Sequence, residues 1–438
     1  MMANKRAPLV LTRQHFGSIV FDRRTSRYLP FDHEATDVLL RLKEDAFDAV
    51  RASAATDAEA RGLEAFFSRF HRLGFFTLEG RFAGDILPLS IRPDHLVGPL
   101  AVHLEIVAAC NLKCAHCFAG PLPRRGGSPL SLVEIDNLFS DMADLGSFRL
   151  GLTGGEPTLR KDLFEILDLA TSHGLHPCLT TNGLLITEAM AREFGKRELV
   201  WLNVSLDGAT PQTNDMVRGK GTFDTILEQV RMLRSHTQFT LAFTVMKHNA
   251  GEARQFAELA RELGASTAVL RPLYPVGTAQ SHLDELMPEY ADYAAAVDAV
   301  ADLAASQGAL RVVDPFGPMS RQPVQAITYA NHGCGAANTV CSISVTGDVN
   351  PCSFLGANFV AGNIRERSLG EIWSASEGFR SMRSLAGGGA DEFSGGCRAR
   401  ALAFGGAINR PDPWIQLEPQ PSIAPMEIVE VDLSFSPQ

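Results

Sequence analysis

The chain has 438 residues, with 40 Lys and Arg against 50 Asp and Glu and a formal net charge of −10. Because a single core stops growing at roughly 250–300 residues, this length predicts more than one domain. The acidic balance argues against a protein that coats nucleic acid, since neutralising phosphates requires a basic surface. No stretch approaches the ~18 uninterrupted apolar residues of a membrane span, and the apolar run Ala7–Leu11 is too short for a signal peptide. The simplest expectation is a cytoplasmic protein that binds neither nucleic acid nor membranes.

Residues 1–82 predict a small separate domain. Two apolar runs precede two helices that each have one apolar face, and a short apolar run follows the second helix. The expected elements are strands at Pro8–Thr12 and Ser18–Phe21, helices at Glu34–Leu42 and Ala58–Leu73, and a last strand at Phe75–Leu78. Strands, then helices, then a strand are typical of a winged-helix-like fold. The Pro- and Gly-rich segment 83–99 predicts a linker.

Residues 100–309 alternate between predicted strands and predicted helices. The six expected strands are His103–Ala108, Arg149–Thr153, Pro177–Thr181, Val200–Leu206, Phe239–Val245 and Ala268–Arg271. Parallel strands need helical crossovers of this kind, so the segment predicts an α/β fold, a partial (βα)6 barrel. In such folds the chemistry gathers at the carboxyl ends of the strands.

The regular pattern is lost beyond about residue 310. Residues 310–410 are rich in Gly and hold four cysteines, which predicts an irregular cluster-binding domain, and residues 411–438 predict an extended tail. Of the other cysteines, three fall close together and one, Cys178, stands alone in a predicted strand, which is typical of a small buried residue. Grouped cysteines in a chain expected in the cytoplasm indicate metal ligands rather than disulfides.

The first cysteine group is Cys110, Cys114 and Cys117, in a Cx3Cx2C loop directly after the first predicted barrel strand. Thiolates are the ligands of iron–sulfur clusters and also bind zinc. Three thiolates on one loop can hold three corners of a cubane cluster and leave one iron open for a further ligand. The loop alone also fits a zinc site completed by His116 or His103, because structural zinc takes four ligands.

This loop resembles the signature of the radical SAM superfamily, with His116 at the position usually held by an aromatic residue. Further resemblances follow at the ends of later strands, in Gly154-Gly155-Glu156-Pro157, Thr180-Thr181-Asn182-Gly183 and Ser205-Leu206-Asp207-Gly208. The resemblance implies a [4Fe–4S] cluster on the three cysteines and a binding site for S-adenosylmethionine (SAM). An arginine fork is the expected partner for the SAM carboxylate. The residues implied in SAM binding are His116, Gly154, Gly155, Glu156, Asn182, Ser205, Asp207 and Arg218.

The second cysteine group resembles the C-terminal extension called SPASM, or its shorter relative twitch, in radical SAM maturases. Its members are Cys334, Cys341, Cys352 and Cys397. The later cysteines of the full seven-cysteine pattern are missing, so the resemblance implies one auxiliary [4Fe–4S] cluster, ligated by all four thiolates. Full ligation favours electron transfer over substrate binding, because no iron is left open. A zinc site held by the same four thiolates is the alternative.

The segment around the third of these cysteines departs from one group of relatives. Sulfatase-maturing enzymes carry an acidic residue nearby that is proposed as the base, whereas Ser353 directly follows Cys352 here. This difference argues against formylglycine formation. Asp348 lies close in sequence, but we expect it to hold the turn at Gly347. The sequence therefore indicates no secure general base.

The N-terminal domain resembles the small peptide-binding chaperone of pyrroloquinoline quinone biosynthesis, a type of module that occurs fused to peptide maturases. The resemblance implies a precursor peptide whose leader adds a strand to the edge of the domain's sheet. Such tethering raises the concentration of the core peptide near the barrel to around millimolar. The residues Arg23, Arg24 and Arg27 either contact acidic leader residues or form a solvated turn.

Together these features predict a radical SAM maturase. An electron donor such as a flavodoxin or ferredoxin reduces the cluster, SAM is cleaved, and the 5′-deoxyadenosyl radical abstracts hydrogen from a substrate C–H bond. The expected product is a ribosomally made peptide with a crosslink or another oxidative change. Two alternatives stay open. One is a radical SAM dehydrogenase or cofactor-biosynthesis enzyme acting on a small molecule, and the other is a non-catalytic, zinc-stabilised peptide-binding protein.

Overall fold

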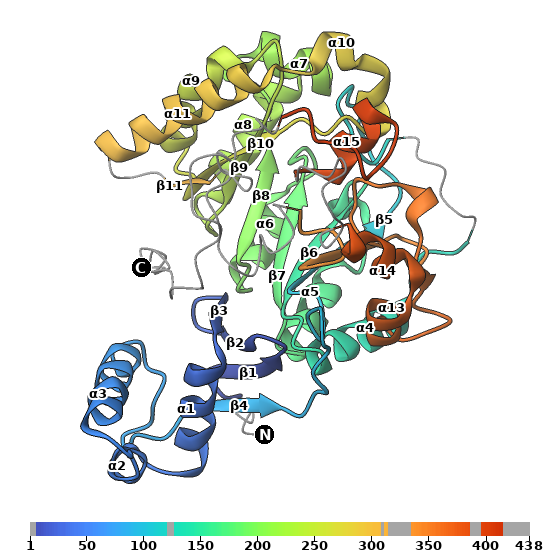
Figure 1. Cartoon of the computed structure of the whole chain (residues 1–438). Helices are drawn as coiled ribbons and strands as arrows, with labels where there is room; N and C mark the ends of the chain where they lie inside the picture. Colours follow the sequence, from blue (N-terminus) through green and yellow to red (C-terminus); the bar gives the residue numbers. More distant parts are fainter. Residues whose placement is uncertain (1–5, 121–126, 308–310, 314–333, 386–395, 415–438) are drawn as a thin grey trace.

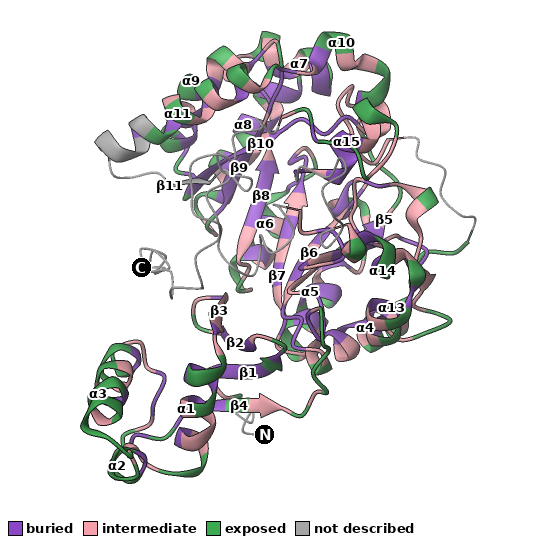
Figure 2. Cartoon of the chain, in the orientation of Figure 1, coloured by how far each residue is buried: buried purple, intermediate pink, exposed green. Residues whose placement is uncertain are grey.

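The computed structural model of the chain describes residues 6–120, 127–307, 311–313, 334–385 and 396–414. Two sheets organise these residues (Figure 1). The smaller has the strand order β3-β2-β1-β4, and the larger has the order β11-β10-β9-β8-β7-β6-β5-β12-β13-β14. In Figure 2 the strands of the larger sheet are mostly buried, whereas the helices around it are exposed on their outer sides.

The N-terminal segment forms the smaller sheet and three helices. Its elements are β1 (Leu9–Gln14), β2 (Gly17–Asp22), β3 (Arg27–Phe31), α1 (His33–Glu44), α2 (Phe47–Ala52), α3 (Asp57–His71) and β4 (Gly84–Leu87). Strand β4 pairs in parallel with β1, although the sequence predicted a linker there. The predicted strand Phe75–Leu78 is wrong: Phe76 makes only an isolated bridge to Phe82. A tight turn explains the difference, because Thr77 accepts a backbone hydrogen bond from Gly80, whose φ is +75°.

The smaller sheet lies between its own helices and the barrel. Leu11 and Val20 face α1 and α3, whereas Val10, Ile19 and Phe21 belong to the main core. The ring of Phe21 stacks on Phe148 of the barrel with 4.8 Å between centroids. The main core therefore extends into one face of the smaller sheet, while the other face packs on the N-terminal helices in a separate core.

Arg23 and Arg24 of the basic turn each have structural partners. Arg23 lies 4.4 Å over the Phe148 ring and donates a hydrogen bond of 2.6 Å to the carbonyl of Gly174. Arg24 pairs with Asp22 and donates to the carbonyls of Leu73 and Gly74, just beyond α3. Neither interpretation from the sequence, a leader contact or a solvated turn, describes these two residues.

The middle of the chain forms the predicted partial barrel. The elements are β5 (Ala101–Val107), α4 (Leu132–Asp144), β6 (Arg149–Gly154), α5 (Leu163–Ser172), β7 (His176–Thr181), α6 (Glu188–Gly195), β8 (Trp201–Ser205), α7 (Pro211–Arg218), α8 (Thr222–Leu233), β9 (Thr240–Val245), α9 (Ala253–Glu262), β10 (Thr267–Pro272), α10 (Leu283–Leu286), α11 (Tyr290–Gln307) and β11 (Arg311–Val313). Strands β5 to β11 pair in parallel in chain order. The sheet does not close, so the expectation of an open α/β barrel is confirmed.

The C-terminal segment extends the barrel sheet, where the sequence predicted only irregular structure. Its elements are β12 (Val340–Ile343), β13 (Asp348–Asn350), β14 (Gly362–Asn363), α13 (Leu369–Ala375), α14 (Glu377–Ser384) and α15 (Arg398–Gly405). Strand β12 pairs in parallel with β5 and thus covers an edge that would otherwise be unpaired. The fully buried Trp373 donates to the carbonyl of Leu96 at 2.7 Å and anchors α13 to the barrel.

The first residues of the predicted tail are packed rather than extended. The carboxylate of Asp412 pairs with Arg400 at 2.8 Å, and both side chains are buried. Trp414 lies against Arg400 and against Tyr293 of α11. Residues 415–438 lie outside the described residues. No described helix is long and apolar enough to cross a lipid bilayer.

Truncating Phe21 tests the joint between the N-terminal segment and the barrel. Phe21 is 1% exposed and reaches into the main core, so Phe21→Ala should lower the free energy of unfolding by about 3–5 kcal/mol. Leu78, which is 99% exposed, gives the matched control Leu78→Ala, with a change near zero. Thermal and denaturant unfolding measure both. Equal stability of the two variants would contradict a shared core.

Candidate active site

The first cysteine group lies on the loop that follows β5. Burial raises the pKa of the Cys114 thiol to about 11 and also raises that of Cys117, while Arg218 acts in the opposite direction on both. The backbone of the loop is fixed from two sides, since Ala115 donates to the carbonyl of Val217 and Thr278 donates to that of Cys117. The three thiols therefore share one neighbourhood at the carboxyl end of the first barrel strand.

The glycines after β6 let two backbones approach closely. A Cβ on Gly155 would lie 2.0 Å from the carbonyl oxygen of Ala109, and Gly154 has a φ of +145°. Two backbone hydrogen bonds join the segments: the N–H of Gly155 donates to the carbonyl of Val107 at 2.7 Å, and the N–H of Glu156 donates to the carbonyl of Ala109 at 2.8 Å. These glycines thus hold the end of β6 against the start of the cluster loop, and an alanine at either position would force them apart.

The carboxylate of Glu156 is buried and fully used within the protein. It accepts hydrogen bonds from Thr158, from the hydroxyl of Thr181 at 2.6 Å and from the backbone N–H of Asn182 at 2.7 Å. The side chain of Asn182 donates to Asn111 in the cluster loop at 2.7 Å. Glu156 therefore positions the end of β7, and the hydrogen bond from Asn182 in turn positions the cluster loop.

A buried carboxylate links the cluster loop to β8 and α7. Asp207 is 0% exposed, and its Oδ2 lies 2.9 Å from Nε2 of His116 and 2.6 Å from a guanidinium nitrogen of Arg218. Its Oδ1 accepts from the N–H of Thr244 at 2.7 Å. Burial acts to raise the pKa of Asp207, but Arg218 and His116 hold that pKa well below its usual range. Asp207 therefore stays ionised and contacts protein on every side.

The other end of this network, at Arg218 and His116, faces the thiols of the first cysteine group. Arg218 is 8% exposed and uses its Nε and one terminal nitrogen on Asp207. The Nδ1 atom of His116 is buried and has no hydrogen-bond partner among the described residues. Ser205, at the end of β8, is partly exposed. An orphaned ring nitrogen and a cationic fork beside three thiols fit an anionic iron–sulfur cluster with a bound ligand.

The lumen of the open barrel holds polar residues that the sequence did not assign to the site. Strand alternation places His103 and Arg271 on the lumen face, and the ring of His103 lies over Gly151. The side chain of His103 is exposed to the open lumen, where desolvation by the surrounding strands, assisted by Arg271, lowers its pKa to about 4. Nδ1 of His103 lies 3.4 Å from the hydroxyl of Ser353. The period-two pattern of β5 and β10 would have identified both residues, had it been read for the inner face.

The second cysteine group divides in the structure. The thiols of Cys334 and Cys397 lie close enough to Cys352 to add to the rise in its pKa that burial causes. Cys341 is apart: burial raises its pKa to about 12, and the charged group that acts on it is Arg383. Asp348 accepts a hydrogen bond from Asn363 at 3.0 Å, as expected for a residue that holds the turn beside Gly347. Cys178 is partly exposed in β7, on the same face of the sheet as Gly151 and His103, and desolvation raises its pKa.

Both thiol groups fit clusters by their donor chemistry. Thiolate ligands and nearby arginines suit an anionic iron–sulfur centre, with Arg218 beside the first group and Arg400 beside the second. Within the described residues no three His, Cys, Asp or Glu side chains enclose a metal position as they stand. The zinc ligands considered from the sequence are otherwise occupied, since His116 pairs with Asp207 and His103 lies in β5.

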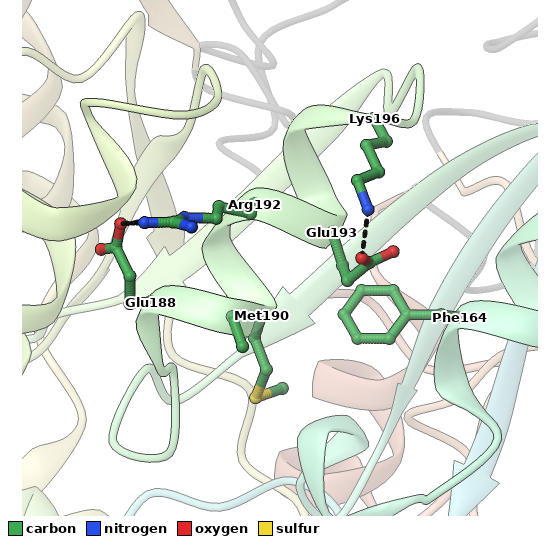
Figure 3. Close-up of a pocket in the computed structure, with 7 residues that line it drawn as sticks. Phe164, Glu188, Met190, Arg192, Glu193 and Lys196 are labelled. Atoms are coloured by element: carbon green, nitrogen blue, oxygen red, sulfur yellow. Dashed lines mark hydrogen bonds and ion pairs between the residues drawn. The ribbon is translucent and has the colours of Figure 1, made fainter.

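One hollow lies far from these residues, between α5 and α6 on the outer face of the barrel (Figure 3). It has a volume of about 570 Å³, and Phe164 and Met190 contribute apolar lining. Its charged residues already pair along α6, Glu188 with Arg192 and Glu193 with Lys196. We therefore place the reactive site at the cluster loop and lumen and not in this hollow.

Comparisons with known proteins agree with this geometry. A family model described as the radical SAM superfamily matches residues 104–260, and one described as an iron–sulfur cluster-binding domain, SPASM, matches residues 334–398. The mycofactocin maturase MftC of Mycolicibacterium smegmatis is 32% identical over 330 residues, covering 73% of this chain and 83% of that protein. The AdoMet-dependent heme synthase of Methanosarcina barkeri is 32% identical over 345 residues, covering 73% and 97%. The structure of Streptococcus suis SuiB bound to S-adenosylmethionine superposes with a TM-score of 0.71 at 17% identity, covering 94% of this chain and 99% of SuiB.

The fold and the two thiol groups define an iron–sulfur enzyme with a partial barrel and a second cluster domain. The chain belongs to the radical SAM superfamily. It is a radical SAM enzyme with one [4Fe–4S] cluster for SAM and an auxiliary cluster in the SPASM domain. The alternative of a non-catalytic, zinc-stabilised protein is therefore wrong.

Replacing Asp207 tests its role in holding the cluster loop. Asp207→Asn leaves Arg218 and His116 without their buried counter-charge, so the free energy of unfolding should fall by about 3–5 kcal/mol. The control is Asp168→Asn, which removes an exposed pair with Arg197 and should cost only about 0–1 kcal/mol. Iron retained after reconstitution should also fall in the Asp207 variant alone. Full retention of iron and stability would contradict the role.

The same variant predicts a dependence on pH. A depressed folded-state pKa means that the stability due to Asp207 is present above the ordinary carboxyl range and is lost as the pH falls through it. The difference in unfolding free energy between wild type and Asp207→Asn should therefore be constant near neutral pH and shrink below about pH 4. Denaturant titrations at several pH values measure it. A difference that grows on acidification would contradict the assignment.

Proposed function

We propose that the chain is a maturase that oxidatively modifies or crosslinks a ribosomally synthesised peptide. The similarity to mycofactocin maturase, 32% over 73% of the chain, is the observation that carries this proposal. The N-terminal segment supports it with an accessible feature: β3 ends the smaller sheet as an edge strand, with residues only partly buried along most of its length. An edge strand offers unpaired backbone groups to an extended leader peptide.

The path from this edge to the cluster sets a minimum length for the substrate. The N-terminal segment lies at the amino ends of the barrel strands, where Arg149 at the start of β6 donates to the carbonyl of Ser26. The cluster loop lies at the opposite ends of those strands (Figure 1). Strand β6 has six residues and so spans about 20 Å. A peptide held at β3 therefore needs on the order of six extended residues before its modified position.

The SAM site that we propose uses the residues grouped around the cluster loop. When cluster and SAM are bound, reductive cleavage supplies a 5′-deoxyadenosyl radical that abstracts hydrogen from a substrate C–H bond. We assign to SAM the backbone at Gly154, Gly155 and Glu156, the hydroxyl of Ser205, and the one terminal nitrogen of Arg218 that is not bound to Asp207. Asp207, Glu156 and Asn182 act through their neighbours, since their side chains contact protein.

Neutral His103 gives the lumen a ring that can hold a substrate by hydrogen bonding. Its pKa of about 4 keeps the ring uncharged at neutral pH, and its Nδ1 lies 3.4 Å from the hydroxyl of Ser353. A ring with so low a pKa is a weak base, so it orients the substrate rather than taking the proton that oxidation of a C–H bond releases. A cytoplasmic electron donor such as a flavodoxin or ferredoxin completes the proposal, because cleavage of SAM consumes one electron.

A small-molecule substrate is the second candidate. The Methanosarcina barkeri heme synthase favours it, since the match covers 97% of that protein at the same 32% identity. In that case the open edge of β3 would have no peptide to bind. Whether the N-terminal segment binds a peptide therefore distinguishes the two candidate functions.

The test uses the reconstituted enzyme, SAM, reductant and a small peptide encoded beside the gene. We expect a SAM-dependent mass change confined to the core half of the peptide. Hydrogen exchange should show protection of the β3 amides when the full-length peptide binds, and none with the core half alone. Turnover of core and full-length peptide at equal rates, with unchanged exchange in β3, would contradict the proposal.

A further inference from the structure

Strand register places Cys341 on the helix side of the barrel sheet. In β12 it pairs with Val102, and the neighbouring Ser342 pairs with His103, whose ring faces the lumen. Side chains alternate between the faces of a strand, so Cys341 and Ser342 point to opposite sides. Cys341 is 1% exposed and belongs to the main hydrophobic core together with Val102 and Trp373.

The other three cysteines of this domain gather on the lumen side. Ser353, next to Cys352, reaches His103 in the lumen. The ring of Phe354, two residues after Cys352, stacks on Tyr274, which follows β10 across the open barrel, with 3.7 Å between centroids. The thiols of Cys334 and Cys397 lie close enough to Cys352 to act on it electrostatically. These three thiols therefore share a site that Cys341 does not face.

Moving Cys341 to that site would disrupt the sheet. Strand β12 is paired on both sides, through four residues to β5 and through Ser342 and Ile343 to β13. Turning one side chain to the opposite face requires a slip by one residue, which turns every side chain of the strand. Ile343, which is 0% exposed, would then leave the core.

We propose that the auxiliary cluster is held by three thiolates, Cys334, Cys352 and Cys397, and that its fourth iron has no cysteine ligand. Cys341 is a core residue. The fourth iron takes a small external donor, a water or an anion, from the lumen side. This replaces the fully ligated cluster expected from the sequence, and it rests on the SPASM domain and not on the identity of the substrate.

The surroundings of the three thiols suit such a cluster. Arg398 and Arg400 are buried beside Cys397, and the N–H of Cys397 donates to Asp412 at 2.6 Å. Arg400 is bound to Asp412, so the two arginines and one carboxylate leave a net positive charge next to the thiolates. Buried cations stabilise an anionic cluster, and a buried wall restricts the open iron to ligands that arrive through the lumen.

The first experiment counts ligands. In a Cys110/Cys114/Cys117→Ala parent only the auxiliary cluster is loaded, with about four irons and four sulfides per chain. Adding Cys341→Ala should leave iron, sulfide and the EPR spectrum unchanged, as should the control Cys178→Ala. Adding Cys352→Ala should reduce the iron by at least half. Loss of iron in the Cys341 variant equal to that in the Cys352 variant, with unfolding curves unchanged, would overturn the proposal.

The second experiment probes the open iron without any change to Cys341. Cyanide is added to the reduced parent, and the EPR spectrum of the auxiliary cluster is recorded. A shift of the g values that saturates with cyanide is expected, because a strong external ligand binds an iron that lacks a thiolate. A spectrum that does not respond to cyanide would overturn the open site even if the Cys341 variant fails to fold.

Discussion

The position of the cluster loop depends on the carboxylate of Asp207. It is fully buried, and it joins three elements that are distant in sequence: His116 in the loop, Arg218 at the end of α7 and the backbone of Thr244 in β9. A buried charge is tolerated only where partners surround it. The need to pair the Asp207 carboxylate therefore fixes the position of each of its three partners. On the other side of the cluster loop, the glycines at the end of β6 let the backbone of β6 lie directly against it. The thiols of the first group are thus placed by contacts to β6, β7, β8 and α7 rather than by their own loop.

The N-terminal segment and the C-terminal domain both pack against the barrel, but at different places. The N-terminal sheet packs at the amino ends of the strands through Phe21, far from the chemistry. The C-terminal domain adds β12 beside β5 and brings its thiols to the open side of the barrel, near Tyr274. A substrate that uses both must pass along the barrel. Because Phe21 packs into the core of the barrel, this contact sets the separation between the smaller sheet and the cluster loop.

Much of the fold and of the first site could be predicted from the sequence because both depend on local patterns. Six of the seven parallel barrel strands follow from the alternation of apolar strand and helix patterns, and the Cx3Cx2C loop follows from its spacing. What could not be predicted depends on pairing between distant segments. Gly84–Leu87 becomes a strand only because β1 offers an edge, and Val340–Ile343 only because β5 does. The same limit applies to Cys341: spacing groups it with the other cysteines, whereas its register on β5 turns it to the core.

The most direct test of the account is SAM cleavage by the reconstituted chain under anaerobic, reducing conditions, with 5′-deoxyadenosine, iron, sulfide and EPR measured together. We expect about eight irons in the wild type, about four in the Cys110/Cys114/Cys117→Ala variant, and 5′-deoxyadenosine from the wild type alone. The Cys178→Ala variant should match the wild type in iron and sulfide content. Zinc in place of iron in the wild type, or equal 5′-deoxyadenosine from the triple variant, would contradict the assignment of the cluster loop.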